Sequence, residues 1–247
     1  MTSDELVSRV CPKIGDLGAA FYFTPETLAR GKELGLDGFR FYFLGRGGVL
    51  GDVEPRVVQS AFGYFATDLV AGMWSSAQER SGMGPREVGR IYVEASRDFG
   101  RSRFAGLGGL EGFCAAAEAV VAGTDPAGLA LYAGLSAEPL PDDLPGRAMQ
   151  LVTVLRELRG SVHLLAVTAG GVSPLVAHYF RRPNDFTLFG YSEDQTPELT
   201  EADRSAMKAA DADTDRMMAA AFSVLGPDDA GALAAGVEAM AAAAGAS

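Results

Sequence analysis

The sequence has few of the residues that bind metals or form disulfides. Among its 247 residues are two cysteines, Cys11 and Cys114, and two histidines, His163 and His178. The cysteines form no CxxC pair and the histidines have no HxxxH or HExxH spacing, whereas zinc sites need such closely spaced ligands. We therefore predict no metal site, and we expect both cysteines to be reduced, apolar core residues of a cytoplasmic protein.

Positive charge and long apolar runs are also scarce. The 21 Lys and Arg residues are outnumbered by 32 Asp and Glu residues, which gives a net charge of −11 at pH 7. An acidic surface repels the phosphates of DNA and of anionic membranes. No uncharged apolar run reaches the roughly 18 residues that a membrane span requires, and acidic residues interrupt any signal-peptide pattern in Met1–Pro12. We expect neither DNA nor a membrane as a partner.

Helix signals, by contrast, recur along the whole chain. Alternating β patterns are limited to Phe39–Phe43 and Phe186–Phe189, so the sequence predicts an all-α, multi-helix fold. The prolines and aspartates of Glu138–Pro145 make this segment the clearest linker. It separates an aromatic-rich helical region, residues 1–137, from a C-terminal helical region, residues 138–247, and we expect the two to form one compact unit.

Several helix boundaries follow from local chemistry. Thr24 places a capping hydroxyl directly before Pro25 at a first helical position. Pro12 is expected to kink or break the first helix, because proline lacks the amide hydrogen that a helix interior uses. Apolar side chains at helical spacing predict a single helix over residues 55–74.

The most informative segment is Gly146–Ala169, which is predicted as a long apolar helix and yet carries Arg156, Glu157, Arg159 and His163. Charges removed from water are costly unless they are paired. Such a cluster is either a structural ion-pair network or a functional pocket, and the sequence leaves both open. A histidine near arginines resists protonation, so His163 is a candidate general base, with Glu157 as the second catalytic candidate.

Residues Phe43–Gly51 form a glycine-rich segment around Arg46. Its spacing matches neither GxGxxG nor the phosphate loop, so no nucleotide or other cofactor is predicted. We interpret the segment as a tight turn that permits close helix approach; alternatively, Arg46 projects into the pocket of Glu157. The aromatic residues between Phe21 and Trp74 pack the core or wall a ligand pocket. The candidate residues for binding a small-molecule ligand are Tyr42, Arg46, Glu157, Arg159 and His163.

These residues resemble a mostly actinobacterial family of helical proteins that is described as helix-turn-helix. The resemblance is carried by Tyr42-Phe43 with Arg46, by Leu155-Arg-Glu157 with Arg159-Gly160 and His163, and by Gly171-Val-Ser-Pro-Leu-Val-Ala-His178. The central motif is a degenerate form of the family's LREhRGdxH pattern. Where the family has a histidine and an aspartate, this chain has Leu158 and Ser161, so two ionisable groups are missing.

The resemblance implies a winged-helix-like element, with Pro174–Arg182 as a short second helix and Phe186–Tyr191 as a remnant wing. Six acidic residues and no Lys or Arg lie between Asp185 and Asp203, and DNA phosphates would repel them. We therefore expect a small-molecule-binding protein of a helix-turn-helix-like family with little DNA affinity. The alternatives are an enzyme of specialised metabolism with His163 as general base, and a ligand-responsive transcriptional regulator. A homodimer through the last helix is one option for its assembly.

Overall fold

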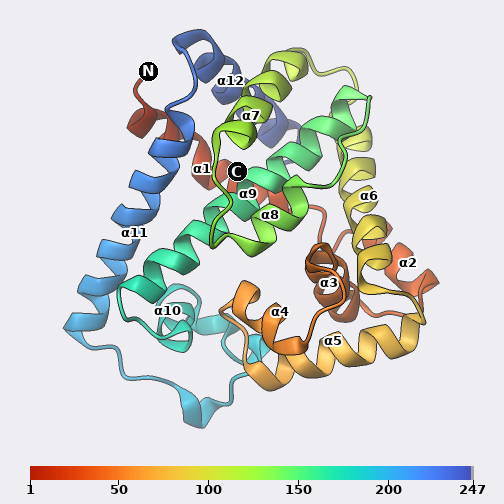
Figure 1. Cartoon of the computed structure of the whole chain (residues 1–247), viewed down its shortest axis with the longest axis vertical. Helices are drawn as coiled ribbons and strands as arrows, with labels where there is room; N and C mark the ends of the chain where they lie inside the picture. Colours follow the sequence, from red (N-terminus) through yellow and green to blue (C-terminus); the bar gives the residue numbers. More distant parts are fainter. Residues whose placement is uncertain (246–247) are drawn as a thin grey trace.

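Helices account for all the regular structure of the computed structural model, which describes residues 1–245. Within that range the chain forms twelve α-helices and no strand, which confirms the predicted all-α fold (Figure 1). The two short β candidates are wrong. Residues Phe39–Phe43 lie in helix α3 (Gly38–Gly47), and Phe186–Phe189 belongs to a stretch of 3-10 turns.

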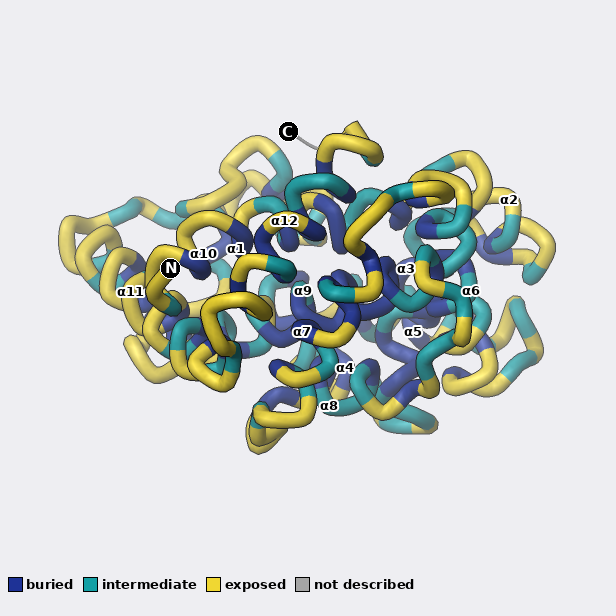
Figure 2. The backbone as a smooth tube through the Cα atoms, turned by 90° about the horizontal axis from the view of Figure 1, so that it is seen from above, coloured by how far each residue is buried: buried dark blue, intermediate teal, exposed yellow. Residues whose placement is uncertain are grey.

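Helix α9 (Leu144–Ala169) runs through the middle of the molecule, and α1 (Ser3–Ala19), α6 (Pro85–Arg103), α7 (Leu110–Gly123) and α11 (Glu201–Phe222) pack against it (Figure 1). Residues 148–155 of α9 are all buried, which is the pattern of a helix enclosed on every side. Figure 2 shows the buried backbone gathered around α9, while the exposed backbone lies towards α11 at one end and α2 at the other.

The remaining helices pack around this centre. Helix α12 lies against α1 and α7, α8 against α9, α3 against α5 and α6, and α10 against α9 and α11. Their bounds are Pro25–Glu33 for α2, Pro55–Phe62 for α4, Thr67–Ser81 for α5, Ala130–Ser136 for α8, Pro174–Arg181 for α10 and Pro227–Ala244 for α12.

One large hydrophobic cluster reaches from Leu6 in α1 to Met240 in α12, and a smaller cluster joins the end of α9 to α10 and α11. The proline-rich segment Glu138–Pro145 leads into α9, whose N-terminus is capped by the side chain of Asp143. Helices from both sides of this segment contribute to the large cluster.

Three helix boundaries predicted from the sequence can be compared with the structure. Helix α1 continues through Pro12, which is exposed, so the helix loses one hydrogen bond on its solvent side and does not break. Residues 55–74 form two helices, because Gly63 adopts a φ of +71° and ends α4. Thr24 caps α2 and Pro25 is its first residue, as predicted.

The glycine-rich segment around Arg46 is helical. Helix α3 continues to Gly47, and the predicted tight turn is confined to the 3-10 turn Gly48–Leu50 and to Gly51, where φ is +85°. The predicted close approach is correct, since a Cβ atom on Gly48 would lie 2.2 Å from the carbonyl oxygen of Pro85 in α6. As a result, Arg46 projects from the last turn of a helix that is packed tightly in the core.

Helices α9 and α10 are joined by the four-residue turn 170–173 and meet at 120°. Two helices at about 90–120° joined by a turn of 3–4 residues have the geometry of a helix-turn-helix. Ser173 caps α10 ahead of Pro174, as the sequence predicts. Within residues 1–245 no single helix has the length and apolarity to cross a membrane, and only this bent pair passes that test jointly.

Candidate functional site

A cleft of about 560 Å³ lies between α1, α3, α4, α9 and α10. Its volume falls within the range of roughly 300–1,000 Å³ that is usual for small-molecule sites. The structure brings all five predicted ligand-binding residues into its lining, although they come from two regions of the sequence: Tyr42, Arg46, Glu157, Arg159 and His163.

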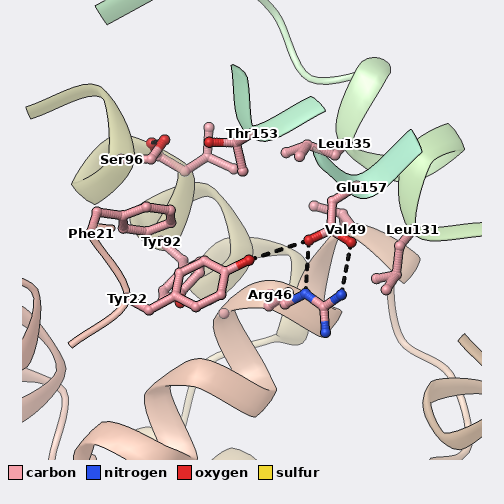
Figure 3. A pocket seen from close by; sticks show the side chains of 12 residues that line it. Phe21, Tyr22, Arg46, Val49, Tyr92, Ser96, Leu131, Leu135, Thr153 and Glu157 are labelled. Atoms are coloured by element: carbon pink, nitrogen blue, oxygen red, sulfur yellow. Dashed lines mark hydrogen bonds and ion pairs between the residues drawn. The ribbon is translucent and has the colours of Figure 1, made fainter. Parts of the chain in front are cut away.

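Glu157 is the most buried charged group of the cleft, with a side chain that is 3% exposed. Arg46 donates to both of its oxygens, from Nε to Oε1 at 2.8 Å and from Nη2 to Oε2 at 2.8 Å (Figure 3). The Oε1 atom also accepts hydrogen bonds from Arg156 Nη1 at 3.0 Å and from the Tyr22 hydroxyl at 3.3 Å. One carboxylate therefore holds two guanidinium groups and a phenol.

This arrangement fixes the protonation state of Glu157. Burial alone would raise the pKa of Glu157, but the charges of Arg46 and Arg156 and the hydrogen bonds from Arg46 and Tyr22 outweigh it and lower the pKa to about 2. The carboxylate is ionised at neutral pH and is a weak proton acceptor. The geometry therefore favours a positioning role for Glu157, which holds Arg46 and Arg156 in place, over a role as general base.

Aromatic rings surround the two guanidinium groups. The Arg46 guanidinium lies 4.5 Å from the centre of the Phe62 ring, and its Nη1 donates to the Tyr42 hydroxyl at 3.0 Å. The Arg156 guanidinium lies 5.0 Å from the centre of the Tyr22 ring. Such contacts attract a cation to the ring face, so the aromatic wall also orients the arginines.

His163 lies on α9 further towards α10, and its hydrogen bond fixes its tautomer. The Thr214 hydroxyl donates its single hydrogen to the Ala210 carbonyl at 2.6 Å, so at 3.0 Å it must accept from His163 Nδ1. The unprotonated nitrogen is then Nε2. Burial lowers the pKa of His163, Asp211 raises it, and nearby arginines lower it further, so the ring is neutral at pH 7. The arginine effect predicted from sequence is present, but burial is the larger cause.

Three buried polar atoms of cleft-lining residues have no hydrogen-bond partner within residues 1–245. They are the Tyr64 hydroxyl, Arg159 Nε and His178 Nε2. More than about 90% of buried polar groups in proteins are paired, and each unpaired one costs about 1–3 kcal/mol. Residues 1–245 therefore leave three hydrogen-bonding groups beside the cleft unsatisfied.

Four further residues line the cleft that were not predicted from the sequence as ligand-binding residues: Tyr22, Tyr64, Arg156 and His178. Arg156 carried a signal, since it is a charged residue inside an apolar helix. Tyr64 and His178 carried none, because their role depends on the tertiary packing of α4 and α10. His178 stacks on Phe189 with a ring-centre distance of 3.8 Å.

The side chains that could bind a metal ion do not cluster within residues 1–245. No three His, Cys, Asp or Glu side chains among residues 1–245 lie close enough together to hold a metal ion. Cys11 and Cys114 are buried free thiols, as predicted, and burial raises the pKa of each to about 11. The polar side chains that line the cleft are those of arginine, histidine, tyrosine, serine, aspartate and glutamate.

Comparison with known proteins gives one match. Residues 7–193 match a family described as a helix-turn-helix family, while no curated protein and no solved structure matches the chain. The matched region runs from α1 into the turns after α10, so it contains the whole cleft lining and the 170–173 turn. Residues 186–191 contain no strand, so the remnant wing has no β-structure. Because the match covers more than half of its length, the chain belongs to this helix-turn-helix family.

Proposed function

We propose that this protein binds a small organic molecule in the cleft and has little affinity for DNA. The observation that carries the proposal is the contrast between the cleft and the rest of the chain. The chain has a net charge of −11, whereas the cleft is lined by five arginines and three acidic residues: Arg46, Arg156, Arg159, Arg181 and Arg182 against Asp16, Glu157 and Asp185. Unpaired polar atoms and aromatic walls complete a typical ligand site.

Helix α10 is poorly suited to reading DNA. In DNA-binding helix-turn-helix proteins the second helix presents polar side chains to base edges in the major groove. Here α10 buries Ala177 and His178, and its Leu175, Val176 and Phe180 side chains are half-buried. Its one arginine, Arg181, pairs with Asp211, and Arg182, directly after the helix, lies 3.8 Å from Asp185. Little cationic surface is left for phosphates.

The first experiment is native mass spectrometry of the purified protein, compared with its denatured mass. We expect an additional mass, that of a small molecule, which disappears on denaturation. Arg159→Gln should reduce its retention, because Arg159 lines the cleft and pairs only loosely with Asp215, at 3.4 Å.

Arg30→Gln is the matched control for this variant. Its side chain is 33% exposed and pairs with Asp98 outside the cleft, while that of Arg159 is 34% exposed. Equal retention in Arg159→Gln and Arg30→Gln would contradict a ligand site at Arg159. A mobility shift of DNA at low salt, where electrostatic binding is strongest, would contradict the low DNA affinity.

His163 favours a second candidate function, an enzyme with this residue as general base. The supporting observation is the hydrogen bond from Nδ1 to Thr214, which leaves Nε2 as the basic nitrogen of a neutral ring. General-base catalysis contributes typically about 10²–10⁴-fold. Incubation of the co-purified ligand with the protein should then give a product of different mass, with His163→Gln slowing its formation by that factor. Unchanged turnover in His163→Gln would exclude the base role.

A further inference from the structure

Within residues 1–245, the ion pairs of the cleft leave one of its five arginines without a carboxylate of its own. Three of its arginines each have a carboxylate of their own within 4 Å: Arg159 with Asp215, Arg181 with Asp211 and Arg182 with Asp185. These pairs lie on α9, α10 and the segments beside them, and their acidic partners are all at least one-third exposed. The rim of the cleft is therefore locally neutral.

Arg46 and Arg156 differ from the rim arginines, because they share the single carboxylate of Glu157. Both arginines are protonated, since a guanidinium is not deprotonated in proteins. Glu157 accepts four hydrogen bonds, three of them from these two arginines. Its one negative charge therefore balances only one of the two guanidinium groups. Asp16 also lines the cleft, but it is exposed and makes no ion pair in the described chain.

The two arginines that share Glu157 are partly buried. The side chain of Arg46 is 14% exposed and that of Arg156 is 25% exposed, and the nearest surfaces are the rings of Tyr22, Tyr42 and Phe62. Ring faces attract a cation but carry no counter-charge. A cation that is removed from water favours a bound anion.

We propose that the ligand of the cleft is an organic monoanion, with a carboxylate or equivalent group that pairs with Arg46 and Arg156. Its body is flat and apolar, because the lining of the cleft includes six aromatic side chains: Phe23, Phe39, Tyr42, Phe62, Phe65 and Phe189. This inference rests on the proposed function and adds the charge and shape of the ligand. Because one arginine has no carboxylate of its own, we expect a ligand with one negative charge to bind better than a neutral or a doubly charged one.

Three naphthalene probes of similar size test which ligand charge the cleft prefers. They are 2-naphthoate, 2-naphthamide and 2-naphthylmethylammonium, each titrated into the full chain by calorimetry. We expect the anion to bind at least about tenfold more tightly than the amide, as for a charge-assisted hydrogen bond, and the cation not to bind. Equal binding of the amide overturns the monoanion and leaves small-molecule binding intact.

If none of the probes binds, the co-purified ligand decides. A retained ligand that carries one negative charge supports the inference, and a neutral or cationic one overturns it. The absence of both probe binding and a retained ligand overturns the proposed function itself. The two proposals therefore fail in distinguishable ways.

Variants at Arg156 locate the selecting charge. Arg156→Gln removes the unmatched charge and leaves the Arg46–Glu157 pair in place, so the preference for naphthoate over naphthamide should fall below about threefold. Arg156→Lys should keep the preference, and Arg30→Gln should leave it unchanged. If Arg156→Gln does not fold, Arg156→Met retains the aliphatic stem that packs on Gly18 and tests the same loss of charge. A full preference in the folded, uncharged variant overturns the inference.

Discussion

Replacement of Glu157 by glutamine tests whether this carboxylate holds the centre of the molecule together. Glutamine keeps the shape of the side chain and removes its charge. Arg46 and Arg156 would then both face a neutral amide, which also places an NH₂ group where one guanidinium now donates. The variant thus leaves two partly buried cations without a carboxylate.

The size of the effect follows from the pKa of Glu157. The pKa falls from an ordinary value of 4.5 to about 2 in the folded chain, and each pKa unit corresponds to about 1.4 kcal/mol. The folded state therefore favours the ionised form by about 3 kcal/mol. Breaking a buried ion pair by removing one partner costs about 3–5 kcal/mol. Both routes predict a loss of several kcal/mol for Glu157→Gln at neutral pH.

Urea unfolding followed by far-UV circular dichroism measures this loss. A depressed pKa stabilises the fold above the unfolded-state pKa of 4.5, and that stability is lost as the pH falls through about 2. The difference between the wild type and Glu157→Gln should therefore be constant near neutral pH and shrink over this acidic window. Glu238→Gln is the control, because Glu238 pairs with Arg9 at an exposed site and should have little effect. A loss below about 1 kcal/mol at neutral pH, or a difference that does not change with pH, would refute the reasoning.

Three further predictions concern other positions. Arg156→Gln should lower the free energy of unfolding by less than Glu157→Gln does, because it removes the contacts of one guanidinium and leaves the two hydrogen bonds between Arg46 and Glu157 in place. A loss in urea unfolding as large as that of Glu157→Gln would contradict the sharing of one carboxylate. Burial lowers the pKa of His163 below its usual 6.5, so its neutral form stabilises the fold above pH 6.5 and this stability is lost as the pH falls through the folded pKa. An NMR titration should show an imidazole midpoint below 6.5 and the Nδ1–H tautomer, and a midpoint above 6.5 would be inconsistent with the burial argument. Gly48→Ala should destabilise the fold by about 1–3 kcal/mol through overpacking. Gly72→Ala has no atom near its added Cβ and should stabilise α5 by up to about 1 kcal/mol. Thermal unfolding measures both variants, and the reverse order of stability would show that α3 and α6 can move apart at little cost.

Helix starts were predictable where the chemistry is local. Thr24 and Ser173 each precede a proline, and both cap their helices as expected. The break at Gly63 was not predictable from apolar spacing, because α4 and α5 both direct apolar side chains into the same core and the period continues across the break. Only the backbone conformation of Gly63 distinguishes two helices from one.

The candidate site was predictable only in part. Charged residues inside the apolar α9 segment mark Glu157 and His163 from sequence alone. The partner Arg46 lies 111 residues earlier in the chain, and the glycines around it suggest a turn where the structure has a packed helix. The unpaired hydroxyl of Tyr64 and the unpaired nitrogen of His178 arise from tertiary packing, which no local pattern encodes.

Helix α10, the second helix of the helix-turn-helix, forms part of the cleft lining. Phe189, just after α10, is stacked between Phe65 at 4.1 Å and His178 at 3.8 Å, and its carbonyl accepts a hydrogen bond from the amide of Ala66. Because His178 is buried in this stack, presenting its face of α10 to DNA would require the stack to separate and expose apolar surface. A ligand that fills the cleft adds contacts to the closed arrangement and makes that separation more costly. Under the proposed function, filling the cleft should therefore lower any residual DNA affinity of α10, and a DNA mobility shift that the ligand leaves unchanged would contradict this coupling.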